Sequence, residues 1–409
     1  MDCPILNSIP HRARRLYHVR CRVGIVFLIL ALFAQQHLFL TSRHSLSYKY
    51  AATKFKSPDD DLHVQYWNPN DEKSQFQDEL IANRANWMVL GQGWEGKVFV
   101  YKDSVIKTFT PGWSPFRNCA PDATTKWPTE IPASLIFGGV SNVSNEGDAN
   151  MTYSGFLPVK AHFMAPTSPG APAEWHLVTP LLSGGNLQKL ARHLHSSERP
   201  NSYREIDTIY RPAFNQLLTS MSTLHEAGYC HDDIKPSNIF VQDESRWVIG
   251  DLGNVREVFH PYHSSRIWRD NRQLEDCRAN DVIRVLKSYL KFIQSSIADD
   301  NEFNLAIRGR YEPLSRLFWW ALAEARYISA AELHQRSIAE YPEAASLTVV
   351  DNRFLRSRRF DLLRVLFLRR IATKLTVDHA LMTRIDDISA RWWGMVWLFG
   401  LPDTELCGV

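Results

Sequence analysis

Several side chains that could handle a phosphate group occur close together in the stretch YCHDDIKPSN, residues 229–238. Asp233 can accept a proton from a hydroxyl group or orient it, and Lys235 can neutralise a transferring phosphoryl group. Asn238 lies five residues and Asp251 eighteen residues after Asp233. Their oxygen atoms suit Mg²⁺, or Mn²⁺, because such ions take few protein ligands and complete their shell with phosphate oxygens. The pattern indicates phosphoryl transfer, although the stretch alone also suits a polar loop between a helix and a strand.

A glycine-rich stretch, GQGWEGKV, lies upstream and places Gly91, Gly93 and Gly96 between two strand patterns. Glycines let backbone N–H groups approach phosphate oxygens without a Cβ in the way. A strand rather than a helix follows, which argues against a dinucleotide fold and against a Walker loop. Taken alone, the stretch fits a flexible hairpin turn equally well.

Lys107 follows in SVIKTF, in the middle of an apolar strand pattern. A lysine in this setting commonly points to solvent, but behind a glycine loop it can reach the α- and β-phosphates of a nucleotide. It would then need a carboxylate to hold it. Glu130, in the predicted short helix WPTEIPASLIF, is the nearest candidate.

Taken together and in this order, the motifs resemble those of the protein kinase superfamily, over about residues 87–289. The loop matches at its three glycines and at Val98, VIK matches the third-strand lysine motif, and DLG stands for D-F-G. HDDIKPSN aligns with H-R-D-L-K-x-x-N, with Asp232 in place of the arginine. In having a lysine, Lys235, after the catalytic Asp, the loop resembles that of the serine/threonine branch of the family. The resemblance implies an enzyme that transfers the γ-phosphate of ATP to a hydroxyl, by default a Ser or Thr of a protein.

The same resemblance implies a role for each matching residue. Thr179 aligns with the gatekeeper, and Pro180 and Leu182 align with the adenine contacts; since proline has no N–H, the hinge N–H comes from Leu182. The implied catalytic residues are Asp233, Lys235, Lys107 and Glu130. The implied ATP-binding residues are Gly91, Gly93, Gly96, Val98, Lys107, Thr179, Pro180 and Leu182. The implied ligands of Mg²⁺ or Mn²⁺ are Asn238 and Asp251.

The sequence also departs from the family pattern. The arginine that Asp232 replaces normally docks an activation-loop phosphate, and an acid there would repel one, so no phosphorylation switch of that type is expected. The segment after DLG is short and has no A-P-E match, which puts the shelf for a peptide substrate in doubt. The alternatives are therefore a glycan or small-molecule kinase, or a pseudokinase that binds or scaffolds without transfer.

The elements that must position these residues form two lobes of an α+β, protein-kinase-like fold. Strand patterns dominate residues 83–182, which are predicted as a small β-rich N-lobe. Helical spacing dominates from LQKLARHL onward, so residues 183–409 are predicted as a larger helical C-lobe. The C-terminal ARWWGMVWLFG is predicted to be a core-packing helix, with a partner or membrane contact as the alternative.

The N-terminus resembles a targeting or anchoring segment, because the basic HRARRLYHVRCR precedes the apolar VGIVFLILALFAQQHLFL. We expect a basic tail at 1–22, one signal-anchor transmembrane helix at 23–40 and a stem at 41–82. The positive-inside rule then predicts a single-pass type II membrane protein with its kinase domain in the lumen of the secretory pathway. A cleaved signal peptide and a mitochondrial presequence are the alternatives.

Composition excludes other classes of protein. The chain has 409 residues and a net charge of +3, so no nucleic-acid partner is expected. The six cysteines are widely spaced and form no C-x-x-C, which argues against a zinc site and against a dense disulfide scaffold. Cys230 is predicted to pack in the core, while Cys119, Cys277 and Cys407 could pair in an oxidising lumen.

Overall fold

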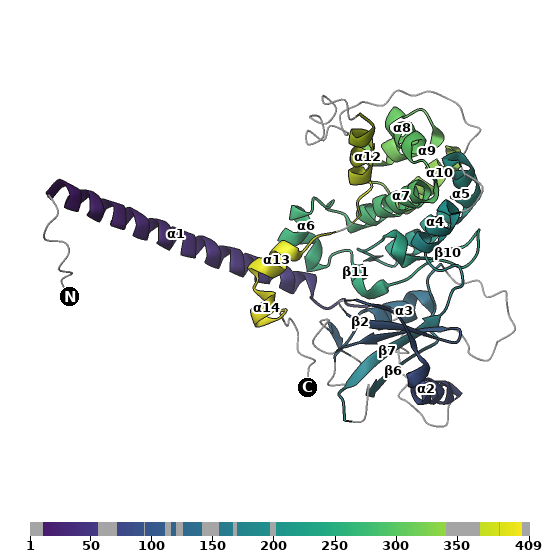
Figure 1. Cartoon of the computed structure of the whole chain (residues 1–409). Coiled ribbons are helices and arrows are strands. Elements are labelled where there is room, and N and C mark those ends of the chain that lie inside the picture. Colours follow the sequence, from purple (N-terminus) through teal and green to yellow (C-terminus); the bar gives the residue numbers. More distant parts are fainter. Residues whose placement is uncertain are drawn as a thin grey trace.

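The computed structural model describes residues 11–55, 72–93, 95–110, 116–119, 126–140, 155–166, 170–196, 202–340, 369–383 and 385–402. A five-stranded antiparallel sheet forms the smaller lobe, a mainly helical lobe adjoins it, and one long helix projects from the body (Figure 1). The α+β, two-lobed fold predicted from the sequence is confirmed.

The sheet of the N-lobe has the strand order β1-β2-β3-β7-β6. The strands are β1 (Met88–Gln92), β2 (Gly96–Tyr101), β3 (Ser104–Phe109), β6 (Ala161–Pro166) and β7 (Ala173–Pro180). Lys107 in β3 lies between Val98 of β2 and Leu177 of β7, so the register fixes it in the middle of the sheet. Two other residues of β3, Ile106 and Phe109, point to opposite faces of the strand. They are buried in two different clusters.

Helix α3 (Glu130–Gly138) is the N-lobe helix that approaches the junction with the C-lobe (Figure 1). Its first turn begins with Glu130, so the carboxylate lies at the end of the helix that favours negative charge. The smaller N-lobe elements are α2 (Glu72–Ala82), η2 (Arg84–Asn86), β4 (Asn118–Cys119) and β5 (Lys126–Trp127).

The C-lobe is built around α5 (Tyr203–Glu226) and α7 (Cys277–Ser296), which pack against each other. Ser202 and Glu205 form a capping box at the start of α5, and the Asn186 side chain caps α4 (Leu187–His195). The other helices of the lobe are α6 (Arg266–Asp270), α8 (Asn301–Gly309), α9 (Pro313–Ala323), α10 (Ala330–Ala339), α12 (Arg369–Ala380), α13 (Ile388–Trp393) and α14 (Val396–Phe399).

Two short β-ladders hold the polar loops at the junction of the lobes. Strand β8 (Tyr229–Cys230) pairs with β11 (Arg256–Glu257), and β9 (Ile239–Val241) pairs with β10 (Trp247–Ile249). The turns between these strands contain η3 (Pro236–Asn238) and η4 (Leu252–Asn254), and η5 (Pro261–Ser264) follows β11. Residues 231–238 and 251–254 are thereby fixed at both ends, which limits their freedom at the cavity described below.

Helix α1 (His11–Lys49) contains the apolar stretch and projects from the body (Figure 1). The part Arg22–Lys49 is long and apolar enough to cross a membrane, and its most apolar window has no buried residue. The helix continues beyond residue 40 into the segment predicted as a stem. There Leu46 and Tyr50 are buried in one cluster with Tyr262 and Ala390, so the end of α1 is packed on the C-lobe.

Cys230 packs in the core as predicted, fully buried in one cluster with Tyr262 and Cys277. It is also bonded to Cys277, with Cα atoms 6.0 Å apart, because β8 ends beside the first residue of α7. One prediction about a single segment is wrong. The C-terminal tryptophans do not pack in a core: α13 packs on the end of α1 through Ala390, and Trp392 and Trp397 are 67% and 70% exposed.

Candidate active site

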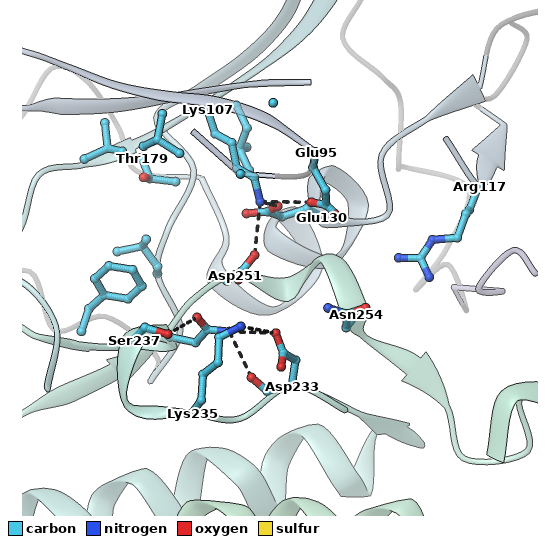
Figure 2. A pocket seen from close by; sticks show the side chains of 18 of the residues that line it. Glu95, Lys107, Arg117, Glu130, Thr179, Asp233, Lys235, Ser237, Asp251 and Asn254 are labelled. Atoms are coloured by element: carbon cyan, nitrogen blue, oxygen red, sulfur yellow. Dashed lines mark hydrogen bonds and ion pairs between the residues drawn. The ribbon is translucent and has the colours of Figure 1, made fainter. Parts of the chain in front are cut away.

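A cavity of about 550 Å³ lies between the lobes, and the predicted motifs meet around it (Figure 2). The glycine loop and β3 contribute Gly93, Gly96, Val98 and Lys107 to its lining, α3 contributes Glu130, and the strand before the hinge contributes Thr179. The C-lobe contributes Asp233, Lys235, Ser237, Asn238 and Asp251. Residues that are far apart in the sequence therefore face one space.

The Lys107 ammonium group is surrounded by three carboxylates (Figure 2). Its Nζ lies 3.2 Å from an oxygen of Asp251 and 3.3 Å from an oxygen of Glu95, and it donates a short hydrogen bond to Glu130. One positive charge thus faces three acidic groups. The excess of carboxylate oxygen suits a divalent cation together with the phosphates that it accompanies.

Burial and charge act in opposite directions on these groups. Burial raises the pKa of Glu130 to about 7, with Lys107 opposing the rise and Asp251 and Glu95 supporting it. For Lys107, burial lowers the pKa, but Asp251, Glu130 and Glu95 outweigh it and hold the pKa well above its usual value. Lys107 is also the main reason that the pKa of Asp251 is lowered. Lys107 therefore carries its charge throughout the ordinary pH range.

Side chains of residues 233–238 form their own hydrogen-bonded group below Lys107 (Figure 2). The Lys235 Nζ donates to an oxygen of Asp233 at 2.7 Å. The Asn238 amide donates to the Asp233 backbone carbonyl at 3.0 Å, which leaves its side-chain oxygen to accept from Ser237 at 3.1 Å. Asp251 lies in a left-handed backbone conformation, with φ of 57°. These contacts fix the side chains whose oxygens could hold a cation.

A buried carboxylate holds the backbone of this loop. Asp281 in α7 accepts hydrogen bonds from the backbone N–H of His231 at 2.6 Å and of Asp232 at 3.0 Å. The Arg284 guanidinium donates to the Asp232 carbonyl, and the His231 ring contacts the Gly250 carbonyl. Helix α7 thus positions the loop through the backbone by way of Asp281, which does not line the cavity.

The three glycines of the loop differ in how much space a side chain would have. A Cβ at Gly96 would lie 1.7 Å from the Thr108 carbonyl oxygen, so the close pairing of β2 with β3 excludes any side chain there. At Gly91 and Gly93 a Cβ would meet open space. Space therefore does not require a glycine at these two positions, and the Gly93 N–H already donates to the Gly96 carbonyl at 2.9 Å.

The far end of the cavity is apolar and could accept a flat ring. Thr179 and Val98 line it with Val105, Leu177 and Phe240. Gly91, Pro180 and Leu182, which the resemblance assigned to ATP binding, are not among the residues that line this cavity. Pro180 is the last residue of β7 and Leu182 follows two residues later, after Thr179, which does line the cavity.

Asp232, which was expected to repel a phosphate, is paired with two basic side chains of the fold. Its carboxylate accepts from Arg256 at 3.0 Å and contacts the His263 ring at 2.9 Å, and the three side chains are almost fully buried. Arg256 and His263 both come from the segment after DLG. Asp232, His263 and Cys277 have metal-ligand atom types close together, but the Cys277 sulfur is in a disulfide and cannot be a thiolate ligand.

Several cavity residues could not be predicted from the motifs. Glu95 lies inside the glycine loop, and its position between Gly93 and Gly96 is the one feature of the sequence that could have indicated that it lines the cavity. Lys49, Tyr50 and Arg391 come from the end of α1 and from α13. Arg117 also lines the cavity, donates to the carbonyls of Lys49 and Gly253, and has a pKa lowered to about 10, first by burial and then by Arg256. No local pattern marked these four.

Comparison with known proteins finds a match to the family described as protein kinase domain, over residues 165–278. The matched segment contains Thr179, Asp233, Asn238 and Asp251, whereas the glycine loop and Lys107 lie before it. The chain is similar to the interferon-induced, double-stranded RNA-activated protein kinase of Rattus norvegicus, with 38% identity over 14% of this chain and 11% of that protein.

Two further relatives match over comparable lengths. One is the eIF-2-alpha kinase GCN2 of Schizosaccharomyces pombe, with 32% identity over 17% of this chain and 4% of that protein. The other is the probable serine/threonine-protein kinase MRK1 homolog of Encephalitozoon cuniculi, with 34% identity over 19% of this chain and 24% of that protein. The chain therefore spans less than a quarter of the length of each of these three curated relatives.

Proposed function

This chain belongs to the protein kinase superfamily, and we propose that it is an active ATP-dependent phosphotransferase that uses a hydroxyl acceptor. One observation carries the proposal: Lys107, Asp233, Asn238 and Asp251 face a single cavity, where Lys107 pairs with Asp251 and Asn238 bonds to Asp233. The family alone does not settle activity, because the fold also serves binding proteins. An intact set of transfer residues favours the enzyme over a pseudokinase.

Each residue has a separate task in the proposed reaction. Lys107, held by Glu130, binds the α- and β-phosphates of ATP, and the glycine loop covers them. Asn238 and Asp251 would hold Mg²⁺ or Mn²⁺, which neutralises phosphate charge when bound. Asp233 takes the proton of the acceptor's hydroxyl group while the hydroxyl oxygen of the acceptor bonds to the γ-phosphorus. The bond from that phosphorus to the β–γ bridging oxygen breaks, and ADP leaves with the electron pair.

We also propose that the domain is anchored by residues 23–40 and lies in the secretory lumen, as a type II membrane protein. The exposed apolar face of α1 supports the anchor, and the basic residues before it support the orientation. The Cys230–Cys277 bond adds support for an oxidising compartment, since disulfides are rare in the cytosol. A mitochondrial location is the alternative.

The acceptor is by default a Ser or Thr of a protein, as in the branch that Lys235 resembles. A glycan or small-molecule hydroxyl is the second candidate, and a specific observation favours it. Residues 49–55 lie along the segment after DLG: the Thr53 hydroxyl donates to the Val255 carbonyl at 2.9 Å, and the His260 ring contacts the Ala51 carbonyl at 3.3 Å. This chain segment covers surface on which an extended peptide would otherwise lie.

The test of activity uses Asp251→Ala against a matched control, Asp243→Ala. Asp243 lies in the turn between β9 and β10 and pairs with Arg246 away from the cavity. Asp251→Ala should abolish Mg-dependent ATP binding and phosphate transfer, while Asp243→Ala leaves both unchanged. Transfer by the Asp251→Ala protein at the rate of the unmodified chain would overturn the proposal.

The acceptor is tested by offering labelled ATP and the full chain to two pools, secreted proteins stripped of glycans and the released glycans themselves. Label on protein supports the default, and label on glycan supports the second candidate. Nucleotide binding with no transfer to either pool would favour the pseudokinase.

A further inference from the structure

The C-terminal helices α13 and α14 present an aromatic face to solvent. Trp392, Trp397 and Phe399 are 67%, 70% and 57% exposed. Trp393 and Leu398 of the same two helices are also exposed. Five large apolar side chains within eight residues are far more than the scattered exposed apolar residues of an ordinary surface. We call these five residues the aromatic face.

The aromatic face is fixed to helix α1. The Phe399 ring meets the Phe39 ring edge-on with centroids 5.8 Å apart, and the Arg43 guanidinium donates to the Gly400 carbonyl. Further along, Lys49 pairs with Asp387 at 2.6 Å, just before α13 begins. Figure 1 shows α13 and α14 beside the part of α1 that joins the body. The position of the aromatic face along α1 is thus set by contacts at both ends.

That position coincides with the end of the apolar run. Residues 23–40 of an α-helix extend about 27 Å at 1.5 Å per residue, close to the roughly 30 Å thickness of a bilayer's hydrocarbon core. Phe39 therefore lies at one edge of the hydrocarbon if the run spans it, and Arg43 lies just outside. Tryptophan favours this interfacial region, because its ring is apolar while its N–H group can bond to water or headgroups.

We propose that the aromatic face inserts into the interfacial region of the same bilayer that α1 spans. The occupant is lipid rather than a second protein, because the face continues directly from the apolar surface of α1 at Phe39. The inference rests on the proposed membrane span and goes beyond it: the anchor alone would leave the domain free to tilt, whereas two contacts fix its orientation.

This placement also fixes the distance between the active-site cavity and the surface of the bilayer. Arg391, which lines the cavity, directly precedes Trp392 in α13, and Lys49 and Tyr50 line the cavity from the end of α1. One wall of the cavity is therefore built from the two elements that contact the bilayer. Acceptor hydroxyls held near the membrane surface are the ones this arrangement brings within reach.

The test places the photo-crosslinker benzoylphenylalanine at single positions of the full chain, reconstituted in phosphatidylcholine vesicles. Trp397 is the test position. Phe259 and Tyr327 are matched controls, since these aromatic residues are 96% and 84% exposed but lie in other parts of the fold. After irradiation, intact-protein mass spectrometry measures the fraction of chains that gain the mass of one phospholipid. Resistance to alkaline carbonate extraction is measured on the same vesicles.

The expected result is a carbonate-resistant protein with a phospholipid adduct at position 397 several-fold above both control positions. A carbonate-resistant protein whose adduct at 397 equals the controls would overturn the interfacial contact and leave the span intact. Extraction by carbonate would overturn the span and the contact together. Crosslinking at 397 to a second protein chain in place of lipid would also overturn the proposal.

Discussion

Replacing Asp232 by Asn should destabilise the folded state strongly, because Asp232 holds two cationic groups in the core. Its carboxylate is 1% exposed, accepts from the equally buried Arg256 at 3.0 Å and contacts His263 at 2.9 Å. Removing one partner of such a buried pair typically costs about 3–5 kcal/mol, since the other charge is left uncompensated. Arg256 keeps its hydrogen bonds to the carbonyls of Asn254 and Lys49, so we expect about 3 kcal/mol.

The assay is denaturant unfolding of the full chain in detergent, followed by near-ultraviolet circular dichroism. Asp270→Asn is the matched control, because the Arg266–Asp270 pair is exposed and such pairs contribute about 0–1 kcal/mol. Adding Arg256→Met to Asp232→Asn should recover part of the loss, since it removes the uncompensated charge. Equal losses for Asp232→Asn and Asp270→Asn, with no recovery in the double variant, would refute the reasoning.

Three further predictions concern other contacts. Glu130→Gln removes a charge-assisted bond to Lys107 worth about 1.5–3 kcal/mol, so kcat/KM for ATP should fall about 10- to 100-fold, while unchanged kinetics would contradict the contact. Replacing Cys230 and Cys277 by Ala should lower unfolding free energy by about 2–4 kcal/mol; equal denaturation midpoints with and without reductant would contradict the bond. Burial lowers the pKa of His263 but Asp232 raises it further, so the net pKa is raised. The stability from this pair is full below about pH 6.5 and is lost as pH rises through the raised pKa. As pH rises through this pKa, the melting temperature of the unmodified chain should fall more than that of His263→Gln. Equal falls in the two proteins would contradict the pairing.

The short motifs were the most predictable part of the site. Asp233 and Asn238 lie in one contiguous loop, so their mutual position depends on local chain geometry more than on the rest of the fold. Lys107 was also predictable, although its strand pattern alone favoured a solvent-facing lysine, because VIK follows the glycine loop in the order of the protein kinase motifs. The two-lobed fold follows from the same change of pattern, from strands to helices.

Contacts between distant segments were not predictable from the sequence. Arg391 and Lys49 reach the cavity only because α13 packs on the end of α1, and no local pattern encodes that packing. The Cys230–Cys277 pair is separated by 47 residues and depends on where β8 meets α7. The exposure of Trp397 was mispredicted for a related reason: an apolar composition does not reveal which side of a helix packs on the rest of the fold.

The central claim is that the cavity transfers phosphate, and the most direct measurement compares the unmodified chain with Asp233→Asn. Both proteins are given Mg²⁺ and γ-labelled ATP, and nucleotide affinity and label transfer are measured on the same samples. The account predicts that Asp233→Asn binds ATP with unchanged affinity, since Lys107, Glu130 and Asp251 remain, but loses transfer. Binding without transfer by the unmodified chain, or equal transfer by both proteins, would contradict it.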